Sequence, residues 1–153
     1  MKTNELTIMT REIVSDAQAL FRKHVNMLDV RVNYACIFSH TDEEYSTLDA
    51  LAQQLGKVVE ATPTGSVYQI QPLDTVAGLL QLLKIRKPDS TRPERGDADF
   101  TVTDYSAFKV EYLGQPGFSL IERPDMEMME LVDPAFNVRA YFSHPTLLEQ
   151  LSV

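Results

Sequence analysis

Apolar side chains recur near the start of the chain with the spacing of a helix. Between residues 10 and 28 they stand three or four positions apart, which places them on one face of an amphipathic helix. The members of this stripe are Ile13, Val14, Ala17, Leu20, Phe21, Val25 and Leu28. Thr10, with Glu12 shortly after it, is typical of a helix start. The pattern predicts a helical extension within residues 1–29.

From residue 30 onward the pattern changes to strand-like runs around a second helix. Residues 30–38 are rich in β-branched and aromatic side chains, which favours a buried strand. A helix is expected next, with Thr41 or Asp42 as its N-cap and Gly56 as its stop. Three more strands are expected over residues 57–62, 66–71 and 79–86.

The same series of elements returns after a polar segment. Residues 87–96, with two prolines and many charges, are expected to form a surface loop. A strand, a short helix capped by Thr103 or Asp104, and three strands follow, at residues 97–102, 105–113, 118–122, 126–132 and 137–143, before a last helical turn at 145–151. We therefore expect one α+β domain over residues 1–153, with βαβββ modules at 30–88 and 97–143.

The second module carries several short motifs. Residues 97–104 (DADFTVTD) combine an opening strand with an acidic helix cap, Gly117 and Phe118 follow an aromatic helix, and Asp133-Pro134 precedes the last strand. These features resemble the vicinal oxygen chelate superfamily, which includes glyoxalase I, extradiol dioxygenases and bleomycin-resistance proteins. The resemblance covers residues 30–143 and implies that the two modules form an open, cup-shaped mixed sheet. The wall of such a cup is a ready concave binding site.

The resemblance also implies where a divalent metal would be held. Its ligands, usually His, Gln and Glu, come from the first and last strands of the modules. Carried over by position, they fall at Asp97, near Ala35 or Cys36, and at Leu82 and Ala140. Leucine and alanine have no ligand atom, and no histidine shows the paired spacing of a metal motif. We therefore expect no metal and no other cofactor.

Composition and charge exclude several classes of function. Hydrophobic residues make up 44% of the 153 residues, which is enough for a core. The 22 acidic and 14 basic residues give a net charge of -8, which disfavours nucleic acids and anionic membranes as partners. Cys36 is the single cysteine, so no intrachain disulfide is available. Without an apolar run of ~20 residues or a signal segment, we expect a cytoplasmic protein.

The charge is unevenly distributed. Residues 84–95 contain five basic and two acidic side chains, a charge of +3, which leaves -11 for the rest of the chain. By strand alternation, Lys84 and Arg86 share a face with Leu82, which the resemblance directs toward the cup. These cations are expected either to bind an anionic ligand or to form ion pairs with the abundant carboxylates. Guanidinium groups suit a ligand carboxylate or phosphate equally well.

The expected site combines these cations with side chains from both first strands. The candidate ligand-binding residues are Lys84, Arg86, Arg139 and Tyr34. For acid–base chemistry without a metal, the candidates are Asp97 and Asp99, which alternate onto one strand face.

Three functions remain open from the sequence. The first is a small-molecule-binding protein with a glyoxalase/bleomycin-resistance-like cup, independent of metal, for which an anion is one candidate ligand. The second is a metal-dependent lyase, isomerase or dioxygenase of the same superfamily. The third is a non-catalytic interaction module, since pairing of such modules between chains would give a homodimer. The sequence does not decide whether the protein is an enzyme.

Overall fold

The computed structural model describes residues 1–26 and 30–153. Helix α1 (Thr3–His24) leads the chain and α4 (Leu147–Leu151) ends it. The first module consists of β1 (Arg31–Phe38), α2 (Asp42–Leu55), β2 (Gly56–Thr62), β3 (Gly65–Thr75) and β4 (Gly78–Arg86). The second consists of β5 (Gly96–Thr101), α3 (Tyr105–Tyr112), β6 (Phe118–Arg123), β7 (Met126–Leu131) and β8 (Arg139–His144). The expected tandem βαβββ order with an added N-terminal helix is confirmed.

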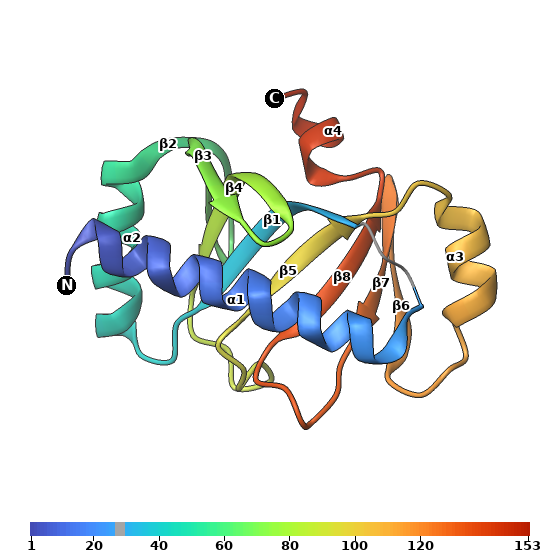
Figure 1. The fold of residues 1–153 in the computed structure, drawn as a ribbon. Coiled ribbons are helices and arrows are strands. Elements are labelled where there is room, and N and C mark those ends of the chain that lie inside the picture. The colour runs from blue at the N-terminus through green and yellow to red at the C-terminus, as the bar shows by residue number, and fades with distance from the viewer. Residues whose placement is uncertain (27–29) are drawn as a thin grey trace.

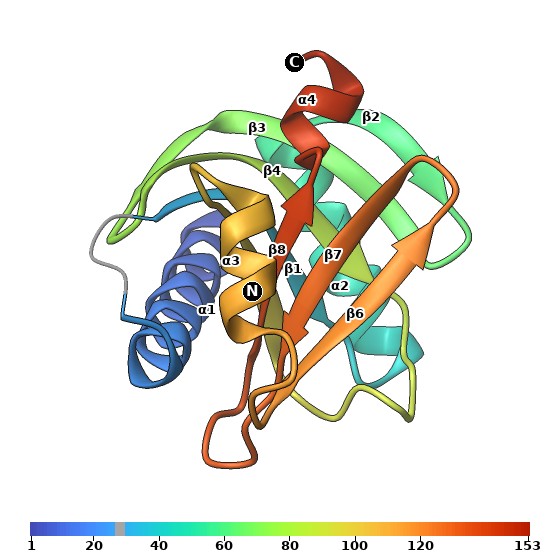
Figure 2. The ribbon, with the colours of Figure 1, turned by 90° about the vertical axis from the view of Figure 1, so that its right-hand side faces the viewer.

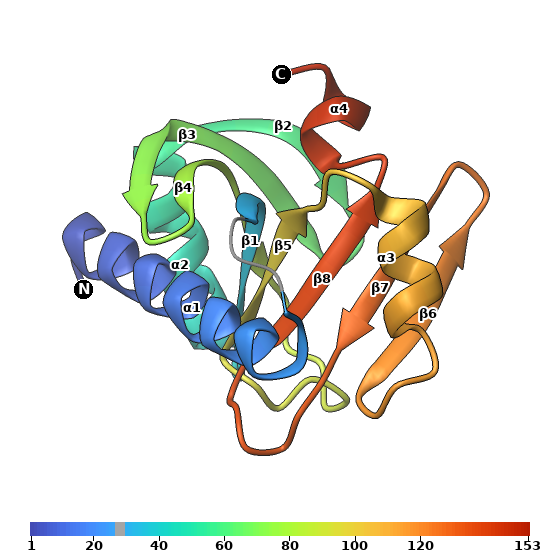
Figure 3. The same ribbon diagram turned by 45° about the vertical axis from the view of Figure 1, so that its right-hand side comes forward.

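All eight strands form one mixed sheet, in the order β2-β3-β4-β1-β5-β8-β7-β6. The two first strands, β1 and β5, meet antiparallel at its centre, and each pairs in parallel with the last strand of its own module. Across the sheet, the strands of the second module thus follow one another in the reverse order of those of the first. Figure 3 shows the outer hairpins, β2–β3 and β6–β7, on either side of the central strands, and Figure 2 shows how strongly the sheet curls.

One face of the sheet packs against helices. Helix α1 lies across the central strands between α2 and α3 (Figure 1). Its Phe21 ring lies 4.8 Å from Phe100 of β5 and 6.1 Å from Phe142 of β8, between ring centroids. Ala35 and Ala98, neighbours across the β1–β5 pair, belong to the same apolar core. Because strand side chains alternate, the residues on either side of these face away from the helices.

The N-terminal helix is longer than the sequence predicted. It begins at Thr3 rather than Thr10, because Leu6 continues the buried stripe one turn further back. The Thr10 hydroxyl donates to the Leu6 carbonyl at 2.8 Å within the helix instead of capping it. The helix ends at His24, and the predicted stripe residue Leu28 lies outside the described residues. No helix among the described residues has the length and apolarity that crossing a bilayer requires.

Both modules start their helix in the same way. Thr41 caps α2 by accepting a hydrogen bond from the Glu44 backbone N–H at 3.0 Å. Asp104 caps α3 by accepting one from the Ala107 N–H at 3.1 Å. Each cap satisfies a backbone donor that the helix itself leaves unpaired. The caps fix where each chain segment leaves its first strand and so set which residues of β1 and β5 lie at the centre of the sheet.

Candidate functional site

The central strand pair presents four polar side chains on the face opposite α1. Tyr34 of β1 is opposite Asp99 of β5, and Cys36 is opposite Asp97. All four line one cavity of about 200 Å³. A phenol, a thiol and two carboxyl groups therefore form the floor of the cup, and the structure brings three of the predicted site residues, Tyr34, Asp97 and Asp99, together there.

The neighbouring last strands supply cations. Lys84 and Arg86 of β4 pair in register with Cys36 and Phe38, and both side chains line the same cavity. On β8, Arg139 and Tyr141 take the corresponding register with Asp97 and Asp99. The expected direction of Lys84 and Arg86 agrees with this geometry.

Ala140, to which the resemblance carried a last-strand metal position, does not face the cup. It pairs with Ala98 and is fully buried in the core under the helices. Strand alternation directs the flanking residues, Arg139 and Tyr141, to the cup face.

Two adjoining cavities occupy the cup. The first, of about 200 Å³, is lined by Tyr34, Cys36, Lys84, Arg86, Arg92, Asp97, Asp99, Ile121, Arg123, Met128 and Tyr141. The second, of about 330 Å³, is lined by Tyr34, Glu60, Thr62, Val67, Lys84, Asp99, Arg123, Met126, Met128, Ser143, Leu147 and Gln150. Five lining residues are common to both cavities, which makes them parts of one elongated site. Ligand pockets commonly span ~300–1,000 Å³.

Asp97 is a buried carboxyl group without a close partner. It is 7% exposed, and no described residue donates a hydrogen bond to it or forms an ion pair with it. Burial, followed by repulsion from Asp99, raises its pKa to about 7, although Arg92, Lys84 and Arg86 act in the opposite direction. Near neutral pH, both the protonated and the ionised form of Asp97 are therefore populated, as general acid–base catalysis requires.

Asp99 has the same burial but a different set of contacts. One of its oxygens, Oδ1, accepts hydrogen bonds from Asn33 Nδ2 at 3.1 Å, Ser143 Oγ at 2.8 Å and the Ser143 N–H at 3.2 Å. Burial raises its pKa to about 6, and these hydrogen bonds limit the rise because they favour the charged form. Of the two carboxyl groups, Asp99 is held in place by its hydrogen bonds, and Asp97 is available to a ligand.

Lys84 is a buried ammonium group bound to hydroxyls only. It is 8% exposed, and its Nζ donates to Thr64 Oγ1 at 2.6 Å and to Thr62 Oγ1 at 3.1 Å. No carboxylate of the described residues lies within ion-pair distance of it. Burial lowers its pKa, since the charged form loses its hydration. The ammonium group retains donor capacity toward the cavity.

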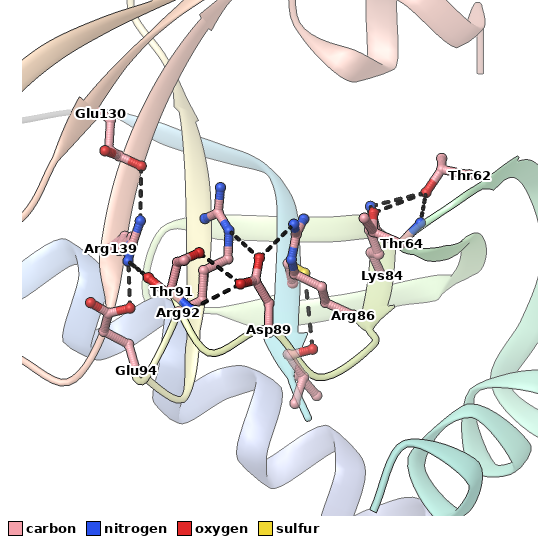
Figure 4. A network of polar contacts seen from close by, with 12 residues as sticks. Thr62, Thr64, Lys84, Arg86, Asp89, Thr91, Arg92, Glu94, Glu130 and Arg139 are labelled. Carbon is pink, nitrogen blue, oxygen red and sulfur yellow. Dashed lines mark hydrogen bonds and ion pairs between the residues drawn. The ribbon is translucent and has the colours of Figure 1, made fainter. Parts of the chain in front are cut away.

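The loop between the modules pairs most of the other cations. Arg86 Nη2 and Arg92 Nε lie 3.3 and 3.7 Å from Asp89 Oδ2, and Thr91 also binds this carboxylate (Figure 4). The ion-pair expectation is therefore met for these arginines. Arg86 Nε is buried and has no acceptor among the described residues, while the Arg86 side chain lines the cavity.

Arg139, a predicted ligand-binding residue, does not line the cavity. Its Nε donates to Glu94 at 2.9 Å, its Nη1 to Glu130 at 3.2 Å and its Nη2 to the Thr91 carbonyl at 2.8 Å. Figure 4 shows Arg139 held between the two carboxylates. These acceptors raise the pKa of Arg139, and they occupy the donors that a ligand would need. Arg139 ties the loop to the second module.

The weak acids of the floor stay neutral. Burial raises the pKa of Tyr34 and of Cys36 well above their ordinary values, and nearby negative charge adds to both effects. A protonated thiol is a poor nucleophile, so Cys36 contributes a small, weakly polar wall. The Tyr34 hydroxyl remains a donor at neutral pH.

The donor set of the cup does not fit a divalent metal. Across residues 1–26 and 30–153, no three His, Cys, Asp or Glu side chains come together as a metal site needs. The carboxyl groups of Asp97 and Asp99 share their cavity with four cationic side chains, which repel a metal ion. Those cations are Lys84, Arg86, Arg92 and Arg123.

Sequence reasoning missed part of the wall. Tyr141 lies two residues after Arg139 on β8, so strand alternation could have found it. Its hydroxyl binds Glu130 and accepts from Arg92 Nη1 at 2.9 Å. Arg92 comes from the loop and Arg123 from the end of β6, and no local pattern places either of them in the cup.

Comparison with known proteins supports the fold alone. No family model and no curated protein matches the chain. A solved structure described as "Structural Genomics, Protein EC4020" matches with a TM-score of 0.65 and 12% identity, over 94% of this chain and 91% of that one. A triple mutant of 4-hydroxymandelate synthase from Streptomyces coelicolor matches with a TM-score of 0.34 and 14% identity, over 76% of this chain and 48% of that one. The second likeness is too low to carry an argument.

Proposed function

We propose that the protein is a divergent member of the vicinal oxygen chelate superfamily that binds a small anionic molecule in its cup without a metal. The observation that carries this proposal is Lys84, a buried ammonium group that lines the cavity and has no carboxylate partner among the described residues. A buried charge is costly unless something compensates it, and a ligand anion does so.

The charge balance of the cavity supports an anion. Four cations line it against two carboxyl groups, and the pKa of both carboxyl groups is raised by burial. The local field of the cup therefore opposes the net charge of -8 of the whole chain.

Asp97 and Asp99 are proposed as the acid–base pair of this site. Asp97, with a pKa of about 7 and no hydrogen bond, exchanges a proton with the ligand, and Asp99 fixes the floor through Asn33 and Ser143. Tyr34 donates a hydrogen bond to the ligand. This arrangement suffices for a proton transfer that needs no metal.

Binding is tested by thermal shift with a panel of carboxylates and inorganic phosphate. Wild type is expected to be stabilised by some members, and Lys84→Met and Arg86→Met to lose at least tenfold in affinity for them. Lys57→Met removes an exposed strand lysine of the same module and serves as the matched control. Unchanged affinity in both cup variants would contradict the proposal, and so would stoichiometric metal in the purified protein.

The homodimer stays a prediction. Light scattering on the full chain gives its mass directly, and a monomer at micromolar concentration would contradict the expectation.

A further inference from the structure

The two cavities of the cup differ in chemistry. We call the first the arginine compartment, after Arg86 and Arg92, and the second the methionine compartment, after Met126 and Met128. Lys84 stands in the wall shared by both. Arg123 and Met128 also line both cavities, whereas Arg86 and Arg92 line only the first and Met126 and Leu147 only the second. A ligand that fills the site therefore meets most of the cations at one end and most of the apolar side chains at the other.

The arginine compartment brings together two cationic side chains of β4. Asp89 binds Arg86 through Nη2 at 3.3 Å, and the Arg86 side chain also lines the cavity. Lys84 lines the same cavity, and its Nζ donates to two threonine hydroxyls. A ligand carboxylate between Arg86 and Lys84 would accept from the guanidinium group and compensate the ammonium group at once.

The same compartment favours a single negative charge. Four cations line it, Asp97 and Asp99 lie in its floor, and Asp89 pairs with Arg86 and Arg92. With these three carboxylates ionised, the excess is one positive charge, which a monoanion neutralises and a dianion such as a phosphate monoester exceeds. The compartment therefore favours a carboxylate over a phosphate ester.

The methionine compartment offers an apolar wall. Val67 from β3, Met126 and Met128 from β7, and Leu147 from α4 line it. Methionine side chains adapt to the shape of an apolar guest. A capping box between Thr146 and Glu149 stabilises the start of α4, and α4 contacts β1, so Leu147 lies in the wall of this cavity.

We infer that the ligand is a small organic monoacid whose carboxylate binds Lys84 and Arg86 and whose apolar body extends past Met126 and Met128 to Leu147. This inference rests on the proposed anion site and adds the polarity and direction of the ligand. The two connected cavities set its length, since the body must reach from the arginine compartment to α4.

Calorimetric titration with n-alkanoates tests the inference. Acetate, butanoate, hexanoate and octanoate are compared with hexanol and hexyl phosphate at pH 7. Affinity is expected to rise about fourfold for each methylene that becomes buried, and so about fifteenfold from butanoate to hexanoate. Hexanol and hexyl phosphate are each expected to bind at least tenfold more weakly than hexanoate.

Variants separate the two ends of the site. Leu147→Gln is expected to reduce the increase in affinity from butanoate to hexanoate by at least threefold. It is expected to leave the affinity for acetate unchanged. Leu79→Gln, at a position that is 57% exposed, provides the matched control with no change. Arg86→Met is expected to weaken all alkanoates by a similar factor.

The outcomes distinguish the inference from the proposed function. Equal affinity for acetate and octanoate, or no effect of Leu147→Gln, would overturn the apolar compartment while the anion site stands. Tighter binding of hexyl phosphate than of hexanoate would overturn the choice of a monoacid. If neither alkanoates nor phosphates bind at millimolar concentration, the proposed anion site itself fails.

Discussion

The two modules share a backbone plan but give different chemistry to the cup. Tyr34 in β1 and Asp97 in β5 each stand seven residues before the N-cap of the following helix, so they hold matched positions. Cys36 and Asp99 are matched in the same way. The first module thus supplies a phenol and a thiol where the second supplies two carboxyl groups. A repeat of elements carries no repeat of function, and the site arises from the difference.

The cations on the last strands of the two modules also differ, in the partners that bind them. Lys84 on β4 is bound only to threonine hydroxyls, whereas Arg139 on β8 lies between Glu94 and Glu130. Both are largely buried, at 8% exposure for Lys84 and 13% for the Arg139 side chain. A paired cation stabilises the fold, and an unpaired one is available to a ligand at a cost in stability.

The largest expected effect is on the paired cation. Arg139→Met leaves Glu94 half-buried without its ion-pair partner and Glu130 with hydroxyl donors only, so the free energy of unfolding should fall by about 3 kcal/mol. Urea unfolding at pH 7 measures this. Arg22→Met, an exposed arginine in the last turn of α1, should change it by less than ~0.5 kcal/mol. A loss below ~1 kcal/mol at Arg139 would remove the contrast between the two cations.

The second effect concerns Asp97, whose substitution should raise the free energy of unfolding, whereas substitution of Arg139 should lower it. Its folded pKa of about 7 lies above the ordinary 3.8, so the folded state binds the proton more tightly than the unfolded chain. The contribution of Asp97 to the free energy of unfolding therefore falls as the pH rises from about 4 to 7. Above pH 7 the carboxyl group is ionised in both states, and the full cost of burying its charge destabilises the folded state. Asp97→Asn should raise the free energy of unfolding on the order of 3 kcal/mol at pH 8 and leave it nearly unchanged at pH 4.

Asp99→Asn provides the internal comparison for Asp97. Asp99 accepts three hydrogen bonds that favour its charged form, so the gain at pH 8 should be clearly smaller than at Asp97. Asp125→Asn, in the exposed turn before β7, should show no pH-dependent gain. Equal gains at Asp97 and Asp99 would mean that the hydrogen bonds of Asp99 do not distinguish the two carboxyl groups.

A third effect concerns the unpaired cation itself. Burial lowers the pKa of Lys84, so its charged form destabilises the folded state at neutral pH. Lys84→Met should raise the free energy of unfolding by about 1 kcal/mol in urea at pH 7, because Thr62 and Thr64 already hydrogen bond to each other at 3.2 Å. Arg139→Met and Lys84→Met would then shift stability in opposite directions. A loss of stability at Lys84 would show that its role is structural.

The fold was predictable because its signals are local. The alternation in residues 97–102 and the caps at Thr41 and Asp104 depend only on neighbouring residues, and they gave the element order. The direction of Lys84 and Arg86 came from alternation with Leu82 together with the resemblance, and both side chains line the cavity. The start of α1 was wrong because Thr10 has the chemistry of a cap, while Leu6 alone extends the stripe before it.

The site was only partly predictable because its remaining contacts are long-range. Arg139 faces the cup side as alternation requires, but Glu94 from the loop and Glu130 from β7 take its donors, and no pattern in the sequence encodes that meeting. Ala140 points into the core, because a count along the chain does not determine which face of β8 a residue takes. The path of the loop decides that Arg92 reaches the cavity.

The smallest expected effect tests whether the modules are equivalent as backbones. Thr41→Ala and Asp104→Ala each remove one hydrogen bond to the first turn of a helix, so each should lower the free energy of unfolding by about 1 kcal/mol. Thr41→Ser and Asp104→Asn retain the accepting oxygen and should recover most of that loss. Similar losses in the two modules would show that the backbone plan is shared even where the cup chemistry is not. A loss of stability confined to one cap would mean that one module depends on its helix start far more than the other. Tertiary packing would then stabilise one of the two helices, α2 or α3, without its cap, although the geometry of the two caps is matched.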